Sequence, residues 1–125
     1  MNRRTILSAL FCAAALAAQT KRPIELHVDL TVAPAKEQEL LKNFRTVFEP
    51  AIRRQPEFTG VKLLKLREVK AGKAPAGANY RLLIGFATEE ARVKWVESKE
   101  HNVAWPSLEG TLGAKDYNAI LYDVR

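Results

Sequence analysis

Strict alternation of apolar and polar residues near the start of the chain most constrains its fold. In the segment IELHVDLTV, 24–32, apolar residues stand at the even positions and polar residues at the odd positions. Because successive side chains of a strand point to opposite faces, this period of two predicts a half-buried β-strand. Such a strand needs neighbours in a sheet and a layer that covers its apolar face.

A helix is predicted to follow this strand. Pro34 suits the first turn of a helix, and apolar residues recur at helical spacing over about 36–54, which predicts one apolar face. Pro50 interrupts this stretch and predicts a kink near the last turn.

Two strands joined by a loop come next. The segment PEFTG, 56–60, predicts a turn, and VKLLKLREV, 61–69, predicts a strand with a bulge at 63–64, where the alternation slips. Small and glycine residues over 71–78 predict a flexible hairpin loop, and YRLLIGFA, 80–87, predicts the third strand.

The last third of the chain predicts a second helix and a final strand. Thr88 is a suitable N-cap, and the helix is expected to run to about Ser98. We expect a less regular segment over 101–109, broken by Pro106, and a last strand over 117–124. The order β-α-β-β-α-β predicts a ferredoxin-like α+β fold, an antiparallel sheet with two helices on one face.

The first residues differ in character from the rest. Residues 1–18 combine a basic start with an apolar stretch and the small residues of a cleavage site, which predicts an export signal peptide. The apolar stretch is shorter than the ~20 residues that span a bilayer as a helix. We therefore expect a single domain over 19–125 in a periplasmic or secreted protein, with no membrane association after removal of the signal. Arg3 and Arg4 are compatible with a twin-arginine signal, and an ordinary secretory signal is the alternative.

Cysteine and charge exclude several classes of protein. Cys12 is the single cysteine and lies inside the predicted signal, so the exported domain would have no disulfide, thiolate nucleophile or cysteine metal site. Loss of Arg3 and Arg4 lowers the formal net charge from +6 to +4, and the remaining bases are scattered. This pattern predicts a solvated surface and no nucleic-acid partner.

Three segments of the chain form a recognisable set: VAPAKEQELLKNF before and within the first helix, the PEFTG turn, and FATEEARVKWVESKEH in the second helix region. Together they resemble the antibiotic biosynthesis monooxygenase (ABM) domain, a member of the dimeric α+β barrel superfamily. The resemblance covers about 24–124. It implies a homodimer whose sheets face one another, with a pocket in each subunit between sheet and helices.

The resemblance also implies a range of activities. Some members of the family oxygenate polycyclic phenols or quinols without metal or flavin, through reaction of the substrate anion with oxygen. Another branch binds and cleaves haem, and many other members have no known activity. The haem branch has a tryptophan where this chain has Phe86, and a proximal histidine where it has Trp105. Both departures argue against haem, so no cofactor is expected.

His101 is the predicted catalytic residue. An imidazole with an ordinary pKa near neutrality can accept a phenolic proton. The alternative is a surface histidine near the end of the second helix. Four aromatic residues are predicted as walls of a pocket for a planar substrate, and plain core or dimer-interface packing is the alternative for them: Tyr80, Phe86, Trp95 and Trp105.

A second polar pair lies on the first strand. His27 and Asp29 are two residues apart, so their side chains point to the same face. They could form an aspartate-oriented base or half of a metal site, or simply lie on a solvated or partner-facing side. With two histidines in the chain, no metal site is predicted. The predicted function is an exported monooxygenase-like enzyme for a small aromatic or quinol substrate, and a non-catalytic small-molecule-binding module is the alternative.

Overall fold

The computed structural model of the chain describes residues 22–75 and 77–125. The export signal predicted over 1–18, with Cys12, lies outside the described residues. Within these two ranges, no helix is long and apolar enough to span a membrane.

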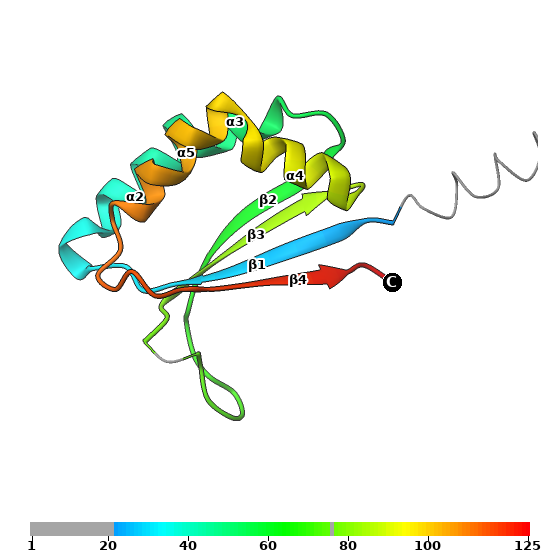
Figure 1. Ribbon diagram of the computed structural model, residues 1–125. Helices are drawn as coiled ribbons and strands as arrows, with labels where there is room; N and C mark the ends of the chain where they lie inside the picture. The colour runs from blue at the N-terminus through cyan, green and yellow to red at the C-terminus, as the bar shows by residue number, and fades with distance from the viewer. Residues whose placement is uncertain (1–21, 76) are drawn as a thin grey trace, which may run out of the picture.

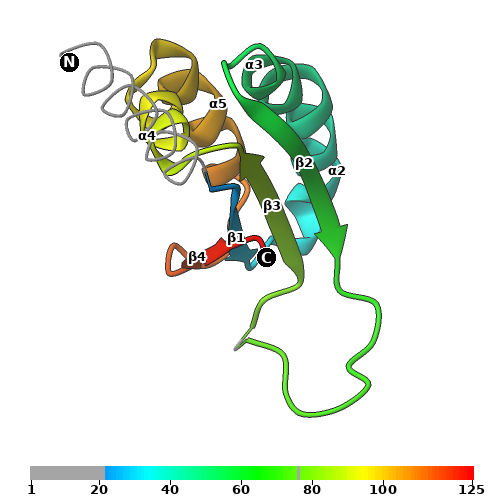
Figure 2. The same ribbon diagram turned by 90° about the vertical axis from the view of Figure 1, so that its right-hand side faces the viewer.

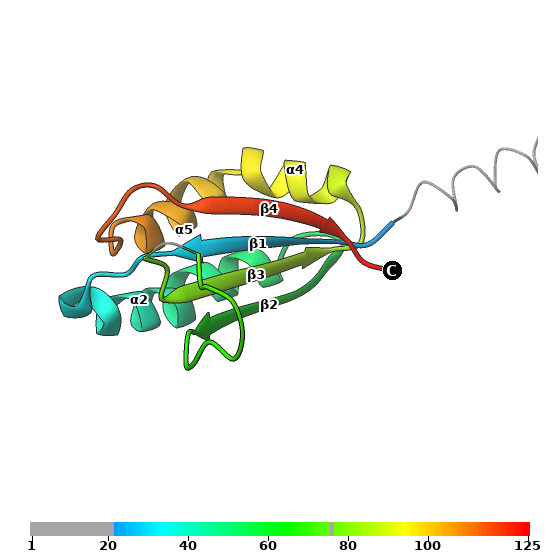
Figure 3. The same ribbon diagram turned by 90° about the horizontal axis from the view of Figure 1, so that it is seen from below.

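Within the described part of the chain, four strands form one antiparallel sheet in the order β2-β3-β1-β4. The chain thus places its first and last strands side by side, as Figure 3 shows. This order, with the helices that join the strands, confirms the predicted ferredoxin-like α+β fold. The strands are β1 (Ile24–Leu30), β2 (Phe58–Lys65), β3 (Tyr80–Phe86) and β4 (Asn118–Asp123).

The helices of the described residues lie on one face of this sheet (Figure 1). The helical segment between β1 and β2 packs beside the helices that follow β3, and together they bury the core. The helical elements are η1 (Pro34–Lys36), α2 (Glu37–Asn43), η2 (Phe44–Phe48), α3 (Glu49–Arg53), α4 (Glu89–Glu97) and α5 (Lys99–Glu109).

The first helical segment changes its hydrogen-bonding pattern just before Pro50. A proline in a helix lacks the N–H donor and its ring clashes with the carbonyl four residues earlier. Here the turn Phe44–Phe48 is a π-helix, and the backbone N–H of Glu49 donates to the carbonyl of Phe44. The irregularity associated with Pro50 therefore takes the form of a wider turn directly before it.

The predicted bounds of the second strand were wrong. The strand covers Phe58–Lys65, and its register is irregular between Phe58 and Gly60 rather than at 63–64. Leu63 pairs with Leu82 and packs against the core, whereas Leu64 pairs with Arg81 on the opposite face. Two neighbouring leucines need no bulge here, because the second face of the sheet is uncovered and leaves Leu64 45% exposed.

The segment 101–109 was also predicted wrongly, because α5 continues through Pro106. Its first turn is capped by Ser98, whose Oγ accepts a hydrogen bond from the backbone N–H of His101. Ala104 and Leu108 on its inner face are fully buried. A proline inside a helix costs about 3 kcal/mol, and burial of a single leucine side chain contributes about 1.5–3 kcal/mol. Tertiary packing thus offsets the local penalty.

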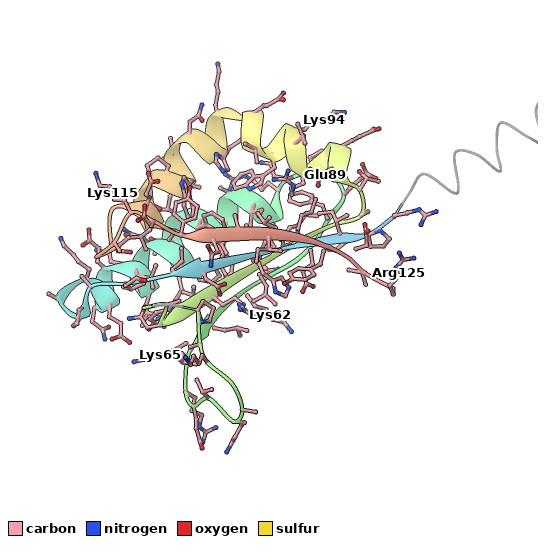
Figure 4. All side chains as sticks on the ribbon, turned by 60° about the horizontal axis from the view of Figure 1, so that its bottom comes forward. Lys62, Lys65, Glu89, Lys94, Lys115 and Arg125 are labelled. Carbon is pink, nitrogen blue, oxygen red and sulfur yellow. The ribbon has the colours of Figure 1, made fainter. Side chains whose placement is uncertain are left out.

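The face of the sheet opposite the helices is open (Figure 3). It carries the polar side chains of β1, and it also exposes the apolar residues Leu64, Ile120 and Tyr122 by 45–48%. Lys62, labelled in Figure 4, stands on this same face beside Leu83. An open face that mixes large apolar and charged side chains is typical of a surface that meets a partner.

Candidate functional site

A cavity of about 200 Å³ lies between the sheet and helices α4 and α5. Its floor comes from β1, β3 and β4, and its walls come from the π-helical turn and from α4 and α5. Most lining side chains are aliphatic or aromatic, and the basic groups among them are those of His101 and Arg92. A mostly apolar pocket with few convergent polar groups is the usual form of a small-molecule site.

Two pairs of aromatic rings shape this cavity. Trp95, 2% exposed, stands edge-on against Phe48 with ring centroids 5.8 Å apart. Trp105 stands against Tyr117 from the loop before β4, with centroids 5.2 Å apart. Flat walls of this kind favour a planar ligand, because ring edges and faces attract one another.

His101 lies on the cavity wall, in the first turn of α5. Its ring is edge-on to Trp95, with centroids 5.1 Å apart and planes at 83°. Burial lowers the pKa of His101 below its ordinary value of 6.5, and the positive charge of Arg92 lowers it further. The imidazole is therefore neutral near pH 7 and able to accept a proton.

Ser98 sets the position of His101 relative to Trp95. It ends α4 and caps α5 at the same time. Its Oγ accepts from the backbone N–H of His101 at 3.2 Å and donates to the backbone carbonyl of Trp95 at 2.6 Å. One hydroxyl thus joins the two helix ends that carry the polar and aromatic walls of the cavity.

Arg92 is the lining residue that the sequence analysis missed. It lies on α4 one turn before Trp95, and its guanidinium binds the carboxylate of Glu89 through Nε and Nη2. This hydrogen bonding raises the pKa of Arg92 above its already high value, so the group stays charged. Helical spacing from Trp95 could have predicted that Arg92 faces inward, but the sequence does not reveal which face of α4 borders a cavity. Glu89 lies in the first turn of α4, as Figure 4 shows.

The four predicted pocket aromatics divide between the cavity and the core. Trp95 and Trp105 line the cavity together with His101, whereas Phe86 and Tyr80 are not among its lining residues. Phe86 is fully buried and packs edge-on against Phe58, with centroids 6.0 Å apart.

Tyr80 lies at the opposite end of β3 from Phe86. Its hydroxyl donates to Glu37 Oε1 at 2.6 Å, and the same oxygen accepts from Lys65 at 2.5 Å. Burial and the Glu37 carboxylate raise the pKa of Tyr80 to about 12. The phenol is therefore held as a neutral donor that ties α2 to the sheet.

The pair His27 and Asp29 lies on the open face, away from the cavity. Each residue has its own partner: His27 Nε2 is 2.6 Å from Glu25 Oε1, and Asp29 accepts from Arg81 Nε at 2.7 Å. The ring of His27 also contacts Tyr122, with centroids 4.7 Å apart. Over residues 22–75 and 77–125, no three histidine or carboxylate side chains come together as a metal site would require.

A second hollow, of about 640 Å³, lies beside the loop that joins β2 to β3. Figure 2 shows this loop reaching away from the helices. Its lining mixes lysine, arginine and carboxylate side chains from the exposed loop. The hollow is more polar than the cavity beside His101.

The cavity beside His101 has the groups needed for proton transfer from a small acidic ligand. A neutral imidazole can take a proton, and a nearby guanidinium favours the anion that results. The cavity volume of about 200 Å³ lies below the range of about 300–1,000 Å³ typical of pockets for drug-sized ligands.

Known structures show the same fold. A point mutant of SnoaB, a cofactor-independent oxygenase from Streptomyces nogalater, aligns with a TM-score of 0.66 and 16% identity over 83% of this chain and 94% of that protein. A candidate antibiotic biosynthesis monooxygenase from Caulobacter crescentus aligns with a TM-score of 0.66 and 18% identity over 85% and 92%. A dimeric ferredoxin-like protein of unknown function from Jannaschia reaches a TM-score of 0.69 at 14% identity, over 82% and 99%. No family model and no curated protein sequence matches the chain. The predicted structural resemblance to ABM proteins is thus confirmed at the level of the fold.

Proposed function

We propose that the chain is an exported, cofactor-independent monooxygenase-like enzyme that acts on a small aromatic or quinol substrate. The observation that carries this proposal is the place of His101. A neutral imidazole stands in an apolar cavity between aromatic walls, which suits a base for the hydroxyl of a planar phenol. The fold of a cofactor-independent oxygenase supports the proposal, although a fold is compatible with many activities.

In the proposed reaction, His101 accepts the proton of a substrate hydroxyl. The electron-rich anion then reacts with molecular oxygen at a ring carbon. One oxygen atom forms the new carbon–oxygen bond, and the other leaves as water with two hydrogens from the substrate. For a hydroquinone the product is a hydroxyquinone, so that the quinol is oxidised and oxygen is reduced. Protonated His101 returns its proton to the departing oxygen.

The proposed enzyme is a homodimer that meets through the open face of its sheet. Apolar side chains such as Ile120 and Tyr122 stand about half exposed on that face. A fold neighbour is described as dimeric, which supports the same assembly for this chain. Dimerisation would cover the exposed apolar area while the cavity remains on the helical side of the sheet.

Oxygen uptake with a panel of hydroquinones and anthrone-like phenols tests the activity. We expect uptake above the spontaneous rate, with formation of the hydroxylated quinone. His101→Gln keeps a polar side chain of similar size but cannot accept the proton, so uptake should fall about 100-fold. His27→Gln is the matched control, because it removes the other histidine, which lies on the open face.

The outcomes separate the proposal from its alternatives. Uptake that His101→Gln leaves unchanged would keep the enzyme and reject His101 as the base. Absence of uptake on every substrate would reject the oxygenase and favour a non-catalytic binding module that uses the same cavity.

A further inference from the structure

Arg92 is the one permanently charged side chain among the described residues that line the cavity. Its side chain is 20% exposed, so its charge is only partly screened by solvent. Interactions with a charge are stronger beside apolar walls than in open solvent. An arginine in this position is therefore suited to recognise a negative group on a ligand.

The ion pair with Glu89 leaves part of the guanidinium available. Glu89 occupies Nε, at 2.9 and 3.0 Å, and one donor of Nη2, at 2.5 Å. A guanidinium has five N–H donors in a rigid plane, so three remain, and two of these lie on the edge formed by Nη1 and Nη2. This edge matches the two oxygens of a carboxylate. Glu89 also holds the plane of the guanidinium, which lowers the entropic penalty of binding a ligand in that orientation.

The cavity also limits the size of the ligand. Its volume is about 200 Å³, whereas an apolar cavity of about 150 Å³ binds one benzene ring. One or two fused rings fit within this volume, and a third ring would extend out of it. The aromatic walls at Trp95 and Trp105 favour a flat ring system.

His101 and Arg92 interact electrostatically, because the charge of Arg92 contributes to the lowered pKa of His101. The two polar groups therefore act on the same region of the cavity. A ligand anion bound to Arg92 would reduce this repulsion and make His101 more basic.

We propose that Arg92 determines specificity by binding the carboxylate of a one- or two-ring aromatic acid, whose rings lie between the aromatic walls. This inference rests on the site of the proposed function and narrows its substrate class to aromatic acids. Arg92 is a binding residue here, and Glu89 positions it.

Calorimetric titration with defined probes tests the inference without turnover. 2-Naphthoate should bind at least tenfold tighter than its uncharged methyl ester, because a charged hydrogen-bonded pair adds more than about 1.4 kcal/mol, which is a factor of ten. In Arg92→Gln, this preference for the acid should fall to near one. Arg53→Gln is the matched control, since Arg53 pairs with Glu49 on α3 in a similar way but does not line the cavity.

A ladder of ring number tests the size limit. Benzoate and 2-naphthoate should bind, and 2-anthroate should bind at least tenfold more weakly than 2-naphthoate. Any one of three results would overturn the inference: equal binding of the acid and the ester, a preference for the acid that survives Arg92→Gln, or tight binding of 2-anthroate. These results are independent of oxygen uptake: selective binding of the acid without uptake would reject only the oxygenase, and uptake of quinols without selective binding of the acid would reject only the role of Arg92.

Discussion

Replacement of Ser98 by alanine tests how the two helices around the cavity are joined. The Ser98 hydroxyl accepts from the backbone N–H of His101 at 3.2 Å and donates to the carbonyl of Trp95 at 2.6 Å. Alanine removes both hydrogen bonds, so one helix loses its N-cap and the other loses a bond at its C-terminal end.

The expected loss of stability follows from these two bonds. Replacement of an N-cap serine by alanine costs about 1 kcal/mol, and loss of a partly buried hydrogen bond costs about 0.5–1.5 kcal/mol. The free energy of unfolding should therefore fall by about 1.5–2.5 kcal/mol. For a domain of this size, the Tm should fall by about 6–15 °C.

Thermal and urea unfolding measure this change. Ser107→Ala is the matched control, because Ser107 is also partly buried and its hydroxyl also donates to a carbonyl three residues earlier, at 2.6 Å, but it caps no helix. The control should stay within about 0.5 kcal/mol of the wild type, since alanine is a better helix former than serine. Ser98→Asn should recover most of the stability, because asparagine is a good N-cap. If Ser98→Ala is no less stable than Ser107→Ala, the capping argument is wrong.

Three further predictions concern pH, an ion pair and assembly. The pKa of His101 is lower in the folded than in the unfolded chain, so as the pH falls the unfolded state binds the proton first. The free energy of unfolding should therefore be highest above about pH 6.5 and decrease as the pH falls below it. Urea unfolding should show a weaker pH dependence in His101→Gln. Arg81→Met leaves the Asp29 carboxylate, 7% exposed, without its guanidinium partner. This should lower the free energy of unfolding by about 1–3 kcal/mol. Adding Asp29→Ala to the same chain should restore most of that loss. Tyr122→Lys on the open face should convert a dimer to a monomer in light scattering, while Val103→Lys on α5 should not; a wild type that is monomeric at all concentrations would contradict the proposed interface.

Features that depend on neighbouring residues were predicted well from the sequence. The alternation over 24–32 predicted β1, and Thr88 was predicted as the N-cap that the structure shows, with Oγ accepting from the backbone N–H of Ala91 at 3.1 Å. These signals are local, because strand period and capping involve residues within one turn or one pleat. The order of such elements was sufficient for the ferredoxin-like fold.

Features that depend on packing between distant segments were not predicted. Pro106 predicted a break, yet α5 continues because Ala104 and Leu108 are buried against the first helical segment. The end of β2 was placed too late, because Leu66 and Val69 continue the apolar pattern but lie in the loop, exposed by 46% and 43%. An apolar residue in a sequence does not reveal whether a partner layer covers it.

The amino-acid sequence by itself determined the alternating strands, the helix cap at Thr88 and the presence of His101, Trp95 and Trp105 within about three turns of helix. Only the tertiary structure decided that these three residues border a cavity, that Arg92 joins them, and that Phe86 and Tyr80 lie elsewhere. The physical reason is that a cavity is the space that non-local packing leaves unfilled. Its walls come from strands and helices far apart in the chain, and no local pattern specifies where their side chains fail to meet.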